Sequence, residues 1–161
     1  METDPHPVSA FRDDALGDLD AVGVAAALAA GEVSRAEVVE AAIARTEAVN
    51  PALNGLAFEA FDLARRRAAA RHPFGGAFDG VPTFVKDNVA VAGMPTMDGT
   101  DAWTPRPEVS DGDFARVYLA TGLVPLGKTR LSEFGFSASA EHPRLGPVRN
   151  PWHTDYTAGA S

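Results

Sequence analysis

The sequence contains no cysteine, and it uses lysine only twice in 161 residues. The lack of cysteine excludes disulfides, thiolate nucleophiles, cysteine-ligated zinc and iron–sulfur clusters within this chain. Basic residues number 14 against 22 acidic ones, and the resulting net charge of −8 argues against nucleic acid and anionic membranes as partners. Long apolar runs are also missing, because the stretch 21–30 is far shorter than the roughly 20 residues of a membrane-spanning helix. With an acidic N-terminus in place of a secretory signal, we expect a cytoplasmic protein.

The two lysines stand out because arginine supplies the other 12 basic residues. Lys86 directly follows the apolar run 81–85, which predicts a buried strand. Arginine keeps its proton in proteins, whereas a partly buried lysine can lose it and act as a base. We therefore interpret Lys86 as a candidate general base, with a solvated strand-terminal lysine as the alternative. The triplet Gly127-Lys128-Thr129 lacks the glycine spacing of a phosphate-binding loop, so we expect a structural role for Lys128.

Glycine and proline are scarce in residues 1–71, which hold seven of them, and frequent in the remainder, which holds 20. The first part accordingly predicts helices. One helix runs between a capping Asp20 and Gly31, and the capping box Ser34-Arg35-Ala36-Glu37 begins a second, which Asn50-Pro51 should end. A short strand over 53–58 and a third helix over 59–71 should follow.

The second part changes character and predicts an α/β fold. A strand over 81–85, a helix over 113–120 and a strand over 123–126 form the order expected of a parallel crossover unit. Pro125 counts against a central position for the last of these strands.

From Ser132 onward no long periodic segment is visible, and the last residues form a small-residue loop of the kind that introduces a helix. We therefore expect an N-terminal segment, 1–19, followed by a domain over 20–161 that is incomplete at its C-terminus. The four histidines show no ligand spacing, so neither a metal nor another cofactor is expected.

Four ordered blocks together resemble the amidase signature family. They read Gly80-Val81-Pro82-Thr83-Phe84-Val85-Lys86-Asp87-Asn88, then Gly122-Leu123-Val124-Pro125-Leu126-Gly127-Lys128-Thr129 with Glu133-Phe134, then Asn150-Pro151-Trp152, and finally Thr157-Ala158-Gly159-Ala160-Ser161. Their order and spacing agree with the family over roughly residues 20–161. Members of this family hydrolyse the carbon–nitrogen bond of amides with a Ser–Ser–Lys triad, on a mixed β-sheet flanked by helices.

The resemblance implies a role for particular residues. Lys86 would be the triad lysine, and Ser161 would be the bridging serine, whose peptide bond is cis in relatives. A neutral lysine amine would accept the proton of the bridging hydroxyl, which in turn takes the proton of the attacking serine. Phe134 and Gly135 are candidates for the wall of the substrate pocket. The implied partner is a small-molecule amide with no cofactor, and a homodimer is an open option.

Two departures from the family pattern affect what this chain can do alone. Ala158-Gly159-Ala160 stands where Pro-Gly-Gly is common, and the nucleophilic serine of the family lies in a later segment. We therefore expect the chain by itself to be inactive. Two alternatives remain. One is the amidase subunit of a tRNA-dependent amidotransferase, although such relatives usually carry a Met-Gly-Ser run where this chain has Gly135-Phe136-Ser137. The other is a non-catalytic truncated paralogue.

Overall fold

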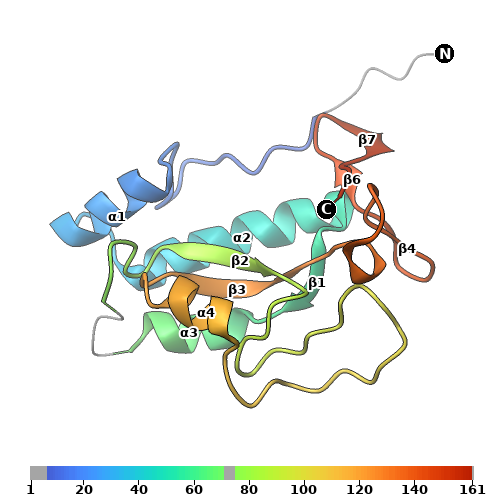
Figure 1. Cartoon of the computed structure of the whole chain (residues 1–161). Coiled ribbons are helices and arrows are strands. Elements are labelled where there is room, and N and C mark those ends of the chain that lie inside the picture. The colour runs from blue at the N-terminus through green and yellow to red at the C-terminus, as the bar shows by residue number, and fades with distance from the viewer. Residues whose placement is uncertain (1–6, 71–74, 161) are drawn as a thin grey trace.

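The computed structural model describes residues 7–70 and 75–160, and it places helices on both faces of a small mixed sheet (Figure 1). The α-helices of this part are α1 (Ala21–Ala30), α2 (Arg35–Leu53), α3 (Phe61–Ala68) and α4 (Asp113–Leu119). The strands are β1 (Leu56–Glu59), β2 (Pro82–Lys86), β3 (Val124–Thr129), β4 (Glu141–His142), β5 (Gly146–Pro147), β6 (Arg149–Asn150) and β7 (His153–Thr157). A 3-10 helix, η1 (Glu133–Gly135), follows β3.

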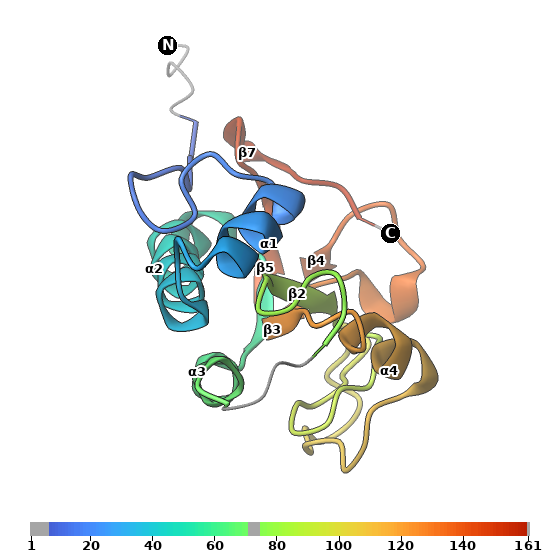
Figure 2. The same cartoon turned by 90° about the vertical axis from the view of Figure 1, so that its left-hand side faces the viewer.

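The main sheet has the strand order β1-β3-β2. Strands β2 and β3 are parallel and are joined through α4, whereas β1 runs antiparallel to β3. The sheet is therefore mixed, and the predicted parallel crossover is confirmed. Figure 2 shows α2 and α3 on one side of the sheet and α4 on the other. The expected α/β class, with N-terminal helices followed by part of a mixed sheet flanked by helices, is confirmed.

The expectation drawn from Pro125 is wrong, because β3 is the central strand of the sheet. Two local features make proline tolerable there. The last residue pair between β1 and β3 joins Glu59 to Gly127, so β1 no longer pairs beside Pro125. On the other side, the register between β2 and β3 shifts between Thr83 and Val85. Proline lacks an N–H donor, and it occupies a position where the regular ladder is already interrupted.

The beginning of α2 matches its sequence signal and its end does not. The Ser34 hydroxyl accepts a hydrogen bond from the Glu37 N–H at 3.2 Å, and the Glu37 carboxylate accepts one from the Ser34 N–H at 2.8 Å. The predicted end at Asn50-Pro51 is wrong, since the helix continues to Leu53 with Pro51 inside it. Because Pro51 lies in the last turn, it removes only one donor near the end of the helix. Asn54 then ends the helix in the left-handed conformation, with φ of 59°.

Apolar side chains cover both faces of the sheet. On the face of α2 and α3, the buried cluster consists of Val39, Ala42, Ile43, Ala64, Ala68, Val124 and Leu126. On the face of α4, it consists of Ala60, Val85, Val91, Met94 and Ala115. Neighbouring residues of β2 divide between the two faces, since Phe84 packs against the first cluster and Val85 belongs to the second. The alternation that is typical of a strand thus places the sheet between two cores.

The region after β3 is made of short elements. Besides η1, it contains two small antiparallel sheets, one formed by β4 and β5 and the other by β6 and β7. The expectation that no long periodic segment follows Ser132 is therefore confirmed. Across the described residues, none of the helices combines the length and apolar character that crossing a membrane requires.

Gly127, the glycine of the central strand β3, should not tolerate a side chain. A Cβ atom at this position would lie 2.2 Å from the carbonyl oxygen of Phe58, so β1 would have to move away from β3. We expect Gly127→Ala to lower the free energy of unfolding by about 2 kcal/mol or more, measured by urea denaturation. Gly55→Ala is the matched control, because nothing lies within 4 Å of a Cβ there. Equal midpoints for the two variants would contradict this account of the β1–β3 contact.

Candidate active site

The carboxyl ends of the parallel strands β2 and β3 meet at one edge of the sheet, and Lys86 lies there. It is the last residue of β2 and pairs with Thr129 of β3. Its half-buried side chain lines a cavity of about 350 Å³ together with Phe84, Phe114 and Tyr118. In open α/β sheets, ligands bind outside the carboxyl ends of the strands. The predicted base is thus found at the edge of the sheet where chemistry usually takes place.

The other lysine, Lys128, is fully buried in the central strand and holds the loop 87–112 in place. Its Nζ donates hydrogen bonds to the carbonyl oxygens of Val89 at 2.6 Å and Pro95 at 3.1 Å, and to Thr96 Oγ1 at 3.3 Å. An ammonium group has three N–H donors, so all of them are used by this loop. Burial lowers the pKa of Lys128, while the nearby carboxylate of Asp87 acts in the opposite direction. The structural role expected for Lys128 is therefore confirmed.

Asp87 fixes the same loop from the end of β2. Its carboxylate accepts a hydrogen bond from the Met97 N–H at 3.2 Å, and its own N–H donates to the carbonyl of Thr129 at 3.0 Å. Burial raises the pKa of Asp87, and hydrogen bonds from the backbone of Met97 and Gly99 together with the charge of Lys128 oppose that change. The loop is therefore attached to β2 through Asp87 and to β3 through Lys128.

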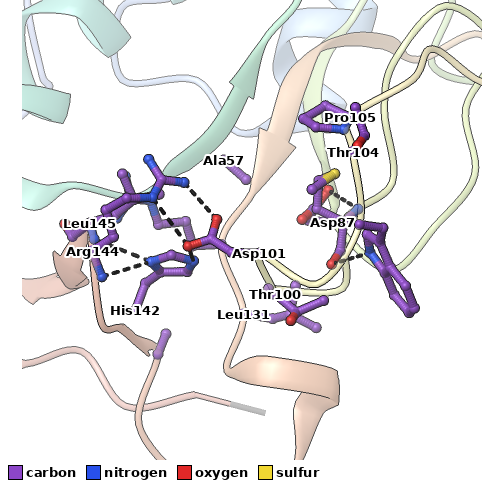
Figure 3. A pocket seen from close by; sticks show the side chains of 15 residues that line it. Ala57, Asp87, Thr100, Asp101, Thr104, Pro105, Leu131, His142, Arg144 and Leu145 are labelled. Atoms are coloured by element: carbon purple, nitrogen blue, oxygen red, sulfur yellow. Dashed lines mark hydrogen bonds and ion pairs between the residues drawn. The ribbon is translucent and has the colours of Figure 1, made fainter.

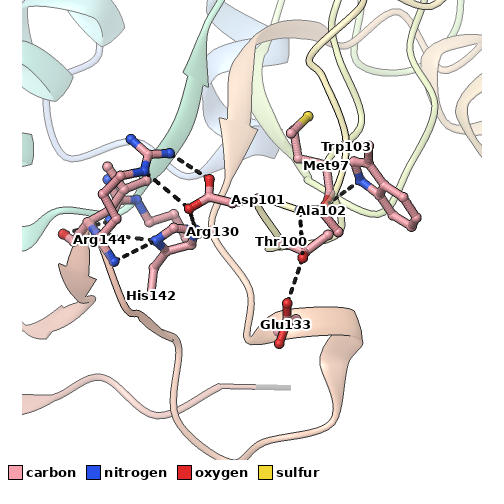
Figure 4. Close-up of polar contacts among 10 residues, drawn as sticks. Met97, Thr100, Asp101, Ala102, Trp103, Arg130, Glu133, His142 and Arg144 are labelled. Carbon is pink, nitrogen blue, oxygen red and sulfur yellow. Dashed lines mark hydrogen bonds and ion pairs between the residues drawn. The ribbon is translucent and has the colours of Figure 1, made fainter.

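Helix η1, which carries the predicted pocket residues, is attached to this loop. The Phe134 N–H donates to the carbonyl of Asp98 at 2.8 Å, and the Thr100 hydroxyl donates to the Glu133 carboxylate at 2.6 Å (Figure 4). The ring of Phe134 meets that of Trp103 edge to face, with centroids 5.5 Å apart. Phe134 and Gly135 both have positive φ, 51° and 72°. Positive φ angles are not those of a regular helix, so the backbone turns sharply at these two residues. The hydrogen bonds from the loop help to hold this turn.

A second cavity, of about 390 Å³, lies between the loop and the strands β1, β3 and β4 (Figure 3). One end of it, called the charged end below, carries the ionisable side chains of Asp101, Arg130, His142 and Arg144. The rest is lined mainly by apolar side chains, which include Ala57, Met97, Trp103, Pro105, Leu131 and Leu145. Its size is in the range of small-molecule pockets, which are mostly apolar with a few polar groups.

The charged end of this cavity is organised around Asp101. The Arg144 guanidinium donates two hydrogen bonds to the carboxylate of Asp101, at 2.6 and 3.1 Å. His142 Nε2 lies 3.4 Å from the same carboxylate, and His142 Nδ1 accepts from the N–H groups of Arg144 and Leu145, each at 3.2 Å. Since Nδ1 is an acceptor, the proton of a neutral ring belongs on Nε2. The neighbouring Arg144 lowers the pKa of Asp101.

The structure brings some of the predicted site residues to one edge and leaves the others unplaced. Lys86 ends β2, and Phe134 and Gly135 follow β3 in η1, but neither Phe134 nor Gly135 lines either of the two cavities above. Ser161 lies outside the described residues. Within the part of the chain that the structure describes, no group of three potential ligand side chains could hold a metal ion.

Sequence reasoning missed the group Asp101–His142–Arg144. These residues are joined only by folding, since 41 positions separate the aspartate from the histidine. Local spacing therefore carried no signal for them. The burial of Asp87 could have been suspected from the sequence, because this residue directly follows an apolar strand and precedes a long loop.

The comparisons with known proteins agree with the placement of the sequence blocks. The family model named Amidase matches residues 37–161. The chain belongs to the amidase family. It is 71% identical over 154 residues to "Putative amidase AmiC" of Mycobacterium leprae (strain TN), a match that covers 96% of this chain and 32% of that protein. The structure also resembles 6-aminohexanoate cyclic dimer hydrolase complexed with substrate, with a TM-score of 0.78 and 35% identity, over 89% of this chain and 30% of that one.

A third relative belongs to another functional branch. It is a glutamyl-tRNA(Gln) amidotransferase subunit of Acidothermus cellulolyticus, 37% identical over 150 residues, which cover 88% of this chain and 29% of that protein. The chain therefore spans about a third of the length of the curated relatives that it matches.

Lys128 should be essential for the order of loop 87–112. Lys128→Met would leave the buried carbonyl oxygens of Val89 and Pro95 without their donor, at a cost of about 3 kcal/mol in the free energy of unfolding. We expect hydrogen–deuterium exchange to speed up across this loop. Arg12→Met is the control, since it removes an exposed basic side chain from the N-terminal segment and should leave loop exchange unchanged. Unchanged exchange in Lys128→Met would show that the loop does not depend on this lysine.

Proposed function

We propose that this chain forms the N-terminal portion of an amidase that hydrolyses the carbon–nitrogen bond of a small-molecule amide through a serine acyl-enzyme. In this reaction the serine oxygen bonds to the amide carbon, the carbon–nitrogen bond breaks, and the leaving amine takes a proton. Water then hydrolyses the resulting ester and releases the acid. The membership of the family supports the reaction class, and the attacking serine is assigned to the family segment that follows these blocks.

The observation that carries this proposal is the position of Lys86. It ends β2, it is only half-buried, and it stands at the carboxyl edge of the sheet next to a loop that Asp87 and Lys128 fix. In the proposed reaction, the neutral amine of Lys86 takes the proton of the Ser161 hydroxyl, which receives the proton of the attacking serine. Lysine suits this step because, unlike arginine, it can give up its proton in a protein.

The aromatic side chain of Phe134 in η1 provides the proposed wall of the substrate pocket. Phe134 is 43% exposed and contacts Trp103, which is 45% exposed. Exposed aromatic rings next to a catalytic edge can bind the apolar part of a substrate. Together with Gly135, which lets the chain turn sharply, Phe134 would therefore contact the acyl side of the amide.

A second function is the amidase subunit of a tRNA-dependent amidotransferase, and the 37% identity to a protein of that kind favours it. It ranks lower because the identity to the AmiC protein is 71%. The run Gly135-Phe136-Ser137, where that branch usually has Met-Gly-Ser, points in the same direction. Release of free ammonia from simple amides without tRNA separates the two.

Lys86 should be indispensable for hydrolysis. In the complete gene product, we expect Lys86→Ala and Lys86→Arg to lower kcat/KM for ammonia release from small amides by about 10³-fold, because neither side chain can accept the proton. Circular dichroism and urea denaturation should report an intact fold. Arg116→Lys is the control, since Arg116 is 65% exposed and pairs only with its helix neighbour Asp113 among the described residues. Near-normal activity of Lys86→Arg would overturn the role of Lys86 as a base.

The 161-residue chain should release no ammonia on its own, because the attacking serine is assigned to a later segment. The check is mass spectrometry of the chain after incubation with a reagent that reacts covalently with the nucleophilic serine of amide hydrolases. Stable labelling of this chain at a serine, together with measurable hydrolysis, would contradict the assignment.

A further inference from the structure

Arg130 follows β3 directly and projects into the charged end of the 390 Å³ cavity. Its Nε donates to the carbonyl of Leu56 at 2.8 Å, and its Nη1 donates to the carbonyl of Leu145 at 3.2 Å. A guanidinium group has five N–H donors, so these two contacts fix its orientation and leave three donors unused among the described residues. Figure 4 shows Arg130 on the same side of the site as His142 and Arg144.

The charge of Arg130 is not balanced within the described part of the chain. None of the described carboxylates forms an ion pair with it, and Asp101, at the same end of the cavity, pairs with Arg144 and lies near His142. The second carboxylate of the cavity, Asp87, receives the backbone N–H of Met97. Burial lowers the pKa of Arg130, and the like charge of Arg144 lowers it further. A half-buried cation beside another cation is costly unless an anion joins it.

The chemistry of the cavity lining indicates which kind of anion would bind. A guanidinium presents parallel N–H groups that match a carboxylate or a phosphate. The remaining lining is largely apolar, with Leu131, Pro105 and Trp103 among its members. An apolar lining next to a single cationic end favours an organic acid with an apolar body over a compact, fully hydrated inorganic anion.

We propose that this cavity binds a carboxylate-bearing organic ligand, with the carboxylate on Arg130 and the apolar body against Leu131, Pro105 and Trp103. The site does not depend on the amide hydrolysis proposed for Lys86. A failure of the Lys86 experiment leaves it unaffected, and the reverse also holds.

The test is a binding titration of the purified chain with 4-phenylbutyrate and with its uncharged counterpart 4-phenylbutanamide, by isothermal titration calorimetry. We expect the carboxylate to bind at least about 10-fold more tightly than the amide, because a charge-assisted pair in a partly dry site is worth more than a neutral hydrogen bond. Arg130→Gln should bring the affinity for the carboxylate down to that for the amide. Equal affinities for the two compounds in the unchanged chain would overturn the proposal.

Two further variants separate recognition of charge from loss of structure. Asp101→Asn removes the carboxylate that pairs with Arg144, so the charged end becomes more positive. It should therefore strengthen carboxylate binding, whereas Arg130→Gln should weaken it. Arg12→Gln removes an exposed arginine outside the cavity and should change nothing. Weaker binding in all three variants would mean that the effect follows net charge or stability, and it would overturn the assignment to Arg130.

The carboxylate that Arg130 binds can come from a small molecule or from an acidic side chain of another polypeptide segment. Repeating the titration with the complete gene product distinguishes the two sources. Retained binding identifies a free organic acid as the ligand. Binding that is lost there, combined with a destabilising effect of Arg130→Gln, identifies an internal carboxylate. Absence of carboxylate binding in both proteins, with no effect of Arg130→Gln, excludes the site.

Discussion

The buried ammonium group of Lys128 is the constraint on which the rest of this edge of the protein depends. Residues 87–112 connect β2 to α4 without a helix or a continuous strand, and a connection of this length is uncommon in a compact domain. Three hydrogen bonds from a single nitrogen on the central strand tie this loop to the sheet. Because the donor is fully buried, a loop that moved away would leave both the ammonium group and the loop oxygens without partners.

The loop in turn positions its two neighbours, η1 and the charged end of the large cavity. From its far side, the loop contributes the Asp98 carbonyl and the Thr100 hydroxyl to η1, and Asp101 to the charged end of the large cavity. The cavity walls and the turn at Phe134 are thus positioned by a segment that has no regular secondary structure of its own. Groups that bind or react must be held by surrounding contacts, and here Lys128 and Asp87 provide contacts that tie the loop to the sheet.

Local signals in the sequence were sufficient for the elements that position Lys86. The capping box at Ser34, the apolar run before Lys86 and the strand–helix–strand order all depend on neighbouring residues, so they could be read directly. The two predictions based on proline were wrong, because the disfavour of proline inside helices and central strands holds for an average position in these elements. Pro51 lies in a last helical turn, and Pro125 lies where the ladder is interrupted, and neither condition is visible before folding.

The charged end of the large cavity could not be predicted for a different reason. Its members come from the loop, from the residue that follows β3 and from the β4–β5 hairpin, and they meet only in the folded chain. No periodicity links residues that are 41 positions apart. The charge of Arg130, which has no carboxylate partner among the described residues, is likewise a property of the folded chain, in which Asp101 pairs with Arg144.

The two lysines of this arginine-rich chain illustrate how the same side chain serves two different purposes. Lys128 is the more deeply buried, and burial lowers its pKa, so a search for perturbed groups alone would select it as the base. Its geometry excludes that role. All three of its N–H directions point to oxygen acceptors of the loop, which favours the charged form and leaves no lone pair to face a substrate. We therefore assign the proposed base to Lys86, which stands at the end of β2.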